Sequence, residues 1–183
     1  FTEFSNHTVD SNVFSSLDEL PEEVKALLDA EEKHNIYVQR NNTPAYVSLS
    51  ETLKEQGVIF TDIITAAREH SELVQKYFMT KGIKSDEHRL TALHAALMNG
   101  GIFIYVPKNV EIKEPLQAVF LRDNKDASLF NHALIVADEN SQVTYVENYI
   151  STVEGAGLAN ILTEVIAENG AKVLYGAVDT LTK

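Results

Sequence analysis

The chain has 183 residues, 44% of them hydrophobic and 23% charged, and its 27 acidic and 15 basic side chains give a formal net charge of −12. This length suits one domain or two small ones with a substantial core. Both halves are acidic, which disfavours a nucleic-acid partner. There is no cysteine, which excludes disulfides, thiolate nucleophiles and zinc knuckles. No apolar run reaches the ~18 residues of a membrane helix and no signal-like segment opens the chain, so we expect no membrane partner and a cytoplasmic protein.

The first half of the sequence mixes helix signals with one hairpin. Residues 1–16 are rich in Ser, Thr and Asn and read as an arm. Pro21 in a first-turn position, with two glutamates behind it, predicts a helix over about 21–33. β-branched and aromatic residues at 36–38 and 45–49 flank turn residues and predict a short hairpin. Ser50 then begins a brief helix that Gly57 ends.

Two further helices are expected before residue 100. Thr61 or Asp62 can cap a helix whose apolar stripe continues to Gly82. Ser85 and Asp86 are cap candidates for the next helix, which the run Asn99-Gly100-Gly101 stops. We therefore predict a mainly helical N-terminal region with a short β-hairpin over residues 1–100.

From Gly101 onward the helical period disappears and short β-branched runs alternate with turn residues. Strands are predicted at 102–106, 116–121 and 133–136. Residues 138–145 also match residues 168–175 at a shift of 30, and 110–112 fit the same frame. Three such units suggest stacked coils. Spacing alone leaves a sandwich or meander at even odds with a solenoid.

None of the six histidines carries a strong site signature. His88 and His94 do not share a helix face, so they do not form a metal pair. His70 lies among glutamates typical of a solvated helix surface. His132 precedes a predicted strand and is expected to cap or line a turn. We predict no metal-binding residue.

Paired carboxylates offer the only acid–base candidates. Asp123 with Asp126, or Asp138 with Glu139, could serve a polysaccharide cleft. Both pairs lie in turn sequences, where aspartate is favoured for backbone reasons. The glycines at 155 and 157 lack the context of a phosphate loop. We therefore predict no catalytic and no cofactor-binding residue in this chain.

One run of the sequence resembles a known family. The segment GIFIYVPKNV at residues 101–110, followed by PLQA at 115–118, is similar to a motif of the SufB/SufD family of iron–sulfur cluster assembly proteins. Residues 92–97 and 134–147 also resemble that family, with His94 where Asn is the commoner occupant. The entry region of the SufD branch is matched by residues 57–62 and 73–78. The resemblance covers about residues 57–183.

The SufD branch is the closer match, because Val146-Glu147 continues as Asn148-Tyr149 without the cysteine common in the SufB branch. The resemblance implies an α+β fold in which a helical N-terminal region precedes the first coils of a right-handed parallel β-helix, here residues 101–183. It implies a complex with a SufB-like homologue and a SufC-like ABC ATPase. Iron or an iron–sulfur cluster would be handled by that intact complex, with no cofactor in this chain.

Two classes of function follow. The first is a non-catalytic assembly subunit, of which this chain is expected to be an N-terminal piece with a C-terminal end that self-associates. The alternative is a carbohydrate-active β-helix enzyme, or a binding module, suggested by architecture alone.

Overall fold

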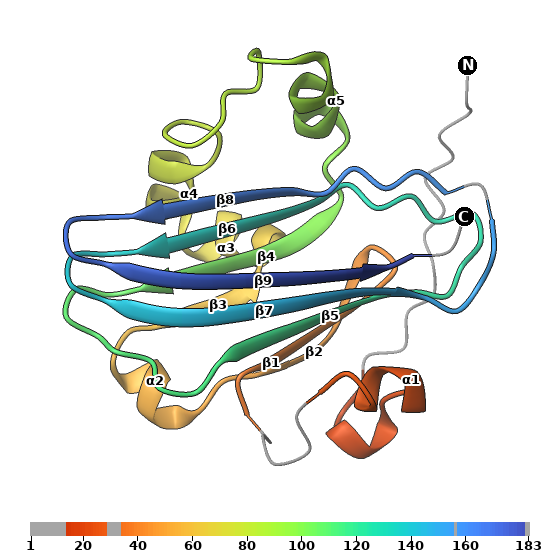
Figure 1. Cartoon of the computed structure of the whole chain (residues 1–183), viewed down its shortest axis with the longest axis horizontal. Coiled ribbons are helices and arrows are strands. Elements are labelled where there is room, and N and C mark those ends of the chain that lie inside the picture. The colour runs from red at the N-terminus through yellow and green to blue at the C-terminus, as the bar shows by residue number, and fades with distance from the viewer. Residues whose placement is uncertain (1–13, 29–33, 156, 182–183) are drawn as a thin grey trace.

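The computed structural model describes residues 14–28, 34–155 and 157–181, whose strands form two sheets (Figure 1). Sheet A has the order β2-β1-β5-β7-β9, and sheet B the order β3-β4-β6-β8. The strands are β1 (Ile36–Arg40), β2 (Thr43–Ser48), β3 (Ile59–Asp62), β4 (Gly100–Val106), β5 (Leu116–Arg122), β6 (Asn131–Ala137), β7 (Gln142–Ser151), β8 (Leu162–Ala167) and β9 (Lys172–Thr180).

From β4 onward the chain alternates between the two sheets, and from β6 onward each strand pairs in parallel with the strand two places earlier. The predicted strands at 102–106, 116–121 and 133–136 are confirmed as parts of β4, β5 and β6. The 30-residue shift is confirmed as well, because Val143 pairs with Val173 and Tyr145 with Tyr175. The repeat in the sequence therefore corresponds to strands stacked side by side.

The turns from sheet B to sheet A repeat at the same interval. Asn109, Asn140 and Gly170 all have a positive φ, of 63°, 57° and 73°, a conformation that asparagine and glycine tolerate. The Asn140 N–H donates to the carbonyl of Asn169, 3.0 Å away. A Cβ on Gly170 would come 2.3 Å from Asn140 Oδ1, so a larger residue here would have to displace that side chain.

Three apolar clusters hold the layers together. The largest lies between the sheets, where residues such as Tyr37 and Phe120 of sheet A meet Ile104 and Ile135 of sheet B. A second packs helices α3 and α4 on the outer face of sheet B. A third covers the outer face of sheet A with the segment that contains α1. Alternate residues of one strand thus face different clusters.

The helices are short. They are α1 (Glu22–Lys25), α2 (Glu51–Glu55), α3 (Ile63–Glu69), α4 (Ser71–Tyr77) and α5 (Arg89–Leu97), with a 3₁₀ turn, η1, at Leu17–Glu19. The Asp62 side chain caps α3 by accepting from Thr65 N, as predicted. No helix of the described residues has the length and apolarity to cross a membrane.

The prediction of a mainly helical region over residues 1–100 is not supported. β1 lies between β2 and β5 in sheet A, and β3 pairs with β4 in sheet B, so this region supplies strands to both sheets. The helix expected over 21–33 is the short α1, and residues 29–33 lie outside the described residues, as does most of the expected arm. The physical reason is tertiary pairing, which local propensity does not report.

Two details of the helical expectation also differ. The stripe from residue 61 to Gly82 is divided into α3 and α4, because His70 at the junction has φ −127° and ψ 40°, outside the helical region. The cap of α5 is His88 in place of Ser85 or Asp86. Its Nδ1 accepts from Leu90 N, 3.1 Å away, and the Thr91 hydroxyl accepts from His88 N.

Candidate functional site

The carboxylate pairs singled out in the sequence are engaged in turns. Asp123 accepts from Arg40 Nε at 2.6 Å and from Asn41 Nδ2 at 2.8 Å. Asn41 in turn accepts from the N–H groups of Asp123 and Asn124 at 3.1 Å. The Asp126 N–H donates to the side chain of Asn124. These contacts hold adjacent turns together, in agreement with the turn interpretation.

The second pair is engaged in the same way. Asp138 accepts from the Tyr105 hydroxyl at 2.9 Å and from Glu139 N at 2.7 Å, while Glu139 forms an ion pair with Lys108. The backbone hydrogen bond from Glu139, with that from Tyr105, lowers the pKa of Asp138. A carboxylate that is held ionised in this way is poorly suited to act as a general acid.

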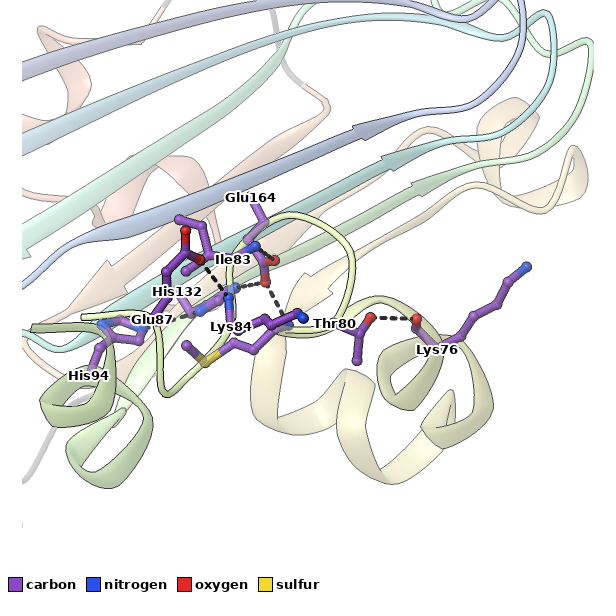
Figure 2. Close-up of polar contacts among 9 residues, drawn as sticks. Lys76, Thr80, Ile83, Lys84, Glu87, His94, His132 and Glu164 are labelled. Carbon is purple, nitrogen blue, oxygen red and sulfur yellow. Dashed lines mark hydrogen bonds and ion pairs between the residues drawn. The ribbon is translucent and has the colours of Figure 1, made fainter. Parts of the chain in front are cut away.

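The histidines give a different result, because two of them meet inside the structure. His94 on α5 and His132 on β6 are both fully buried, and Glu164 on β8 is 2% exposed. His94 Nε2 lies 3.2 Å from His132 Nδ1, and His132 Nε2 lies 3.0 Å from Glu164 Oε2. Figure 2 shows these side chains in a row between the helix and the sheet. The expectation that His132 caps or lines a turn is wrong.

Glu164 also holds the segment that joins α4 to α5. Its carboxylate accepts from Met79 N at 2.8 Å and from Ile83 N at 3.0 Å (Figure 2). A Cβ on Gly82 would come 2.8 Å from Glu164 Oε1, so the chain passes very close to the carboxylate. Burial by itself raises the pKa of Glu164, but the hydrogen bonds from His132 and the two backbone N–H groups outweigh it and leave this pKa lowered.

At the other end of the row, His94 joins α5 to the loop before β8. His94 Nδ1 lies 3.3 Å from the Asn160 carbonyl, and Asn160 Nδ2 donates to the Leu90 carbonyl. Burial, together with the neighbouring His132, lowers the pKa of His94. The Phe78 ring closes one side, 4.5 Å from the ring of His132. The row therefore connects α5, the segment after α4, and two strands of sheet B.

A second buried carboxylate lies between the sheets. Glu147 on β7 is fully buried and accepts from the hydroxyls of Tyr145 at 2.7 Å and Tyr175 at 2.6 Å. The Tyr175 hydroxyl also lies 3.2 Å from Thr163 Oγ1. Burial raises the pKa of Glu147 despite both hydrogen bonds, and it raises the pKa of Tyr175 to about 12. This cluster joins strands β7, β8 and β9 by polar contacts within an apolar layer.

These arrangements suit structural hydrogen bonding more than metal binding. In the described part of the chain, no group of three or more histidine, aspartate or glutamate side chains is placed to hold a metal ion. Neither buried cluster was found from the sequence, where each residue looks ordinary. The 30-residue shift was the available signal, because it puts His132 and Glu164 on neighbouring strands and on the same face.

Comparison with known proteins identifies the class of protein. The model of the SufBD protein N-terminal region matches residues 30–118, and that of the SUF system FeS cluster assembly SufBD core domain matches residues 120–183. The chain belongs to the SufB/SufD family of iron–sulfur cluster assembly proteins.

Individual relatives narrow the match to one branch. The chain is 61% identical over 184 residues to iron-sulfur cluster assembly protein SufD of Bacillus subtilis. This alignment covers 100% of the chain and 42% of that protein. It is 35% identical to a SufBD family protein of Staphylococcus saprophyticus, over 90% of the chain and 37% of that protein. For a Staphylococcus epidermidis SufBD family protein the identity is 36%, over 87% of the chain and 36% of that protein. The chain thus spans about two fifths of the length of these relatives.

Proposed function

We propose that the chain is part of a SufD-type subunit that takes part in iron–sulfur cluster assembly. The observation that carries this proposal is the 61% identity to SufD of Bacillus subtilis along the whole chain. The two family models support it, since they match consecutive stretches in the order N-terminal region then core. The iron–sulfur cluster is the cargo of such a system.

We propose a non-catalytic, cytoplasmic role for the subunit. These 183 residues contain no cysteine, so they supply no thiolate ligand of a cluster and no thiol carrier of sulfur. The candidate acid–base pairs are occupied by turn contacts. Neither observation favours the carbohydrate-active enzyme. The cysteine-bearing partner inferred from the family resemblance is a SufB-like homologue, and the second partner is a SufC-like ABC ATPase.

We further propose that residues 101–183 form the first coils of a right-handed parallel β-helix, preceded by an N-terminal region that ends near residue 100 and adds strands β1, β2 and β3 to the two sheets. The alternation of strands between two sheets, with parallel pairing about every 30 residues, supports the coils. Such coils bury their apolar faces against neighbouring coils, so the fold serves as a scaffold for contacts. A scaffold is the role expected of an assembly subunit.

The test is complementation with complex capture. A Bacillus subtilis strain depleted of SufD receives the full-length protein with an affinity tag, or the 183-residue chain alone as the matched control. We expect the full-length protein to restore the activity of iron–sulfur enzymes and to capture an ABC-type ATPase and a cysteine-bearing homologue. Failure of the full-length protein to restore these activities, while it accumulates in folded form, would contradict the proposal.

A further inference from the structure

The row formed by His94, His132 and Glu164 contains three contacts in series, and each requires one proton. The contacts join the Asn160 carbonyl to His94 Nδ1, His94 Nε2 to His132 Nδ1, and His132 Nε2 to Glu164 Oε2, at 3.3, 3.2 and 3.0 Å. A carbonyl and a carboxylate only accept, and an imidazole nitrogen accepts only when it lacks a proton. A contact without a proton brings two acceptors together, and one with two protons brings two donors together.

The number of protons can therefore be counted. Two neutral imidazoles carry two N–H protons, and an ionised carboxylate carries none, which leaves one of the three contacts empty. Three protons fill every contact and make the three side chains neutral as a group. Four protons force two donors to face each other. Because all three side chains are buried, an unfilled contact or an uncompensated charge is costly here.

We propose that His94, His132 and Glu164 share three protons, with His132 as a buried imidazolium between an ionised Glu164 and a neutral His94, and that this state fastens helix α5 to sheet B. His132 then donates through both ring nitrogens, and His94 donates from Nδ1 to the Asn160 carbonyl. The assignment places the positive charge next to the carboxylate.

Independent features agree with this distribution. Burial and the adjacent His132 lower the pKa of His94, as expected for the neutral member, and the pKa of Glu164 is lowered as well. The titratable groups that face His132 are His94 from α5 and Glu164 from β8. On the segment after α4, Lys81 pairs with Glu168, and Lys84 and Glu87 are exposed. β4 and β6 pair beside His132 at Gly101, which cannot titrate.

Within helix α5, His94 is the residue that reaches the interior. Of the residues of α5, all of which the structure describes, only His94 is buried, and Leu90 is 53% exposed. Figure 1 shows α5 beside β8, apart from α3 and α4. Beside His94, the Leu90 carbonyl of α5 accepts a hydrogen bond from Asn160 in the loop before β8. A change in the proton count therefore acts directly on the position of α5.

The consequence is a two-sided pH dependence. Because the pKa of His94 is lowered on folding, the stability that neutral His94 supplies is present above the ordinary value of ~6.5 and is lost as pH falls. Acid adds a fourth proton and sets two donors against each other. Alkali removes the third proton and empties one contact. Attachment of α5 is expected to be greatest between these limits and to weaken on both sides.

The experiment combines histidine NMR with amide hydrogen exchange on the full-length protein. With ¹⁵N-labelled histidine, signals are assigned by H94Q and H132Q, and H70Q serves as the control. Near neutral pH we expect both nitrogens of His132 to be protonated and His94 to be protonated only at Nδ1. Amide exchange is corrected for intrinsic rates, and the protection of α5 is compared with that of α3. We expect this relative protection to fall about tenfold both on the acid side and on the alkaline side of its maximum.

A third variant separates this arrangement from ordinary packing. E164Q keeps the size of the side chain but removes the charge that compensates the imidazolium, so His132 should become a neutral ring near neutral pH, while H70Q leaves it unchanged. The proposal is overturned if His132 in the unmodified protein carries a proton on only one nitrogen near neutral pH. It is also overturned if the relative protection of α5 is the same at all pH values. Both readouts use the unmodified protein, so they stand even if a variant fails to fold, and neither depends on its function.

Discussion

Replacement of Glu164 by alanine is the sharpest test of the interior described above. The change removes the carboxylate that accepts from His132, Met79 N and Ile83 N. Met79 and Ile83 are partly exposed and their N–H groups can reach water, so most of the cost falls on the fully buried His132. Breaking a buried pair by removal of one partner costs about 3–5 kcal/mol. We expect E164A to lose about 4 kcal/mol of unfolding free energy.

The matched control is E168A, because Glu168 also holds the segment after α4. Glu168 Oε1 lies 2.8 Å from Lys81 Nζ, but the Glu168 side chain is 31% exposed and the Lys81 side chain 47% exposed. Such a pair contributes at most about 1 kcal/mol. Urea denaturation of both variants, with the slope m compared to show that the same surface is exposed on unfolding, measures the difference. If E164A costs no more than E168A, Glu164 is not the buried hydrogen-bonding centre described here.

Three further predictions follow from the coils. G170A should lower the free energy of unfolding by about 1–3 kcal/mol, because φ is +73° and the new Cβ would lie 2.3 Å from Asn140 Oδ1. The control G176A, whose new Cβ would lie 4.0 Å from the nearest side chain, should leave the thermal unfolding nearly unchanged. Burial raises the pKa of Glu147, so the folded state loses stability as pH rises from the ordinary carboxyl range through that raised pKa. E147Q should remove this loss and stabilise the protein at neutral pH but not at pH 3. Equal effects of E147Q at both pH values would contradict the raised pKa. The 183-residue chain should self-associate through the edge strand β9, where Leu174 is 67% exposed. L174K should reduce the association that sedimentation measures. Equal association of the unmodified and the L174K chains would place the contact elsewhere.

The strands of the second half were predictable because their signals are local. Residues 102–106 and 133–136 are β-branched runs bounded by turn residues, and the 30-residue shift fixes which strand lies beside which. β3 (Ile59–Asp62) was missed because it is short and lies between two helices. Its extended state depends on pairing with β4, more than forty residues later. Propensity over a few residues does not contain that information.

Only part of the buried row could be predicted, for a related reason. His94, His132 and Glu164 come from a helix and two strands, and each is polar in a segment whose neighbours are ordinary. The shift of 30 brings His132 beside Leu162, so Glu164 two residues on shares its face. Nothing local in the sequence places His94 above them, because the position of α5 depends on the same contacts. The cap of α5 at His88 was missed because aspartate and serine are the commoner caps.

The two ends of the series of paired strands differ in strand direction, and this sets the order in which the strands can assemble. β2 and β3 are antiparallel to their neighbours, whereas β8 and β9 continue the parallel series. β1 pairs with β5, so this pair forms only after about eighty further residues have been made, which is a slow, long-range step. Each later strand has a folded neighbouring strand to pair with as it leaves the ribosome. Synthesis from the N-terminus therefore follows the order in which the stack grows.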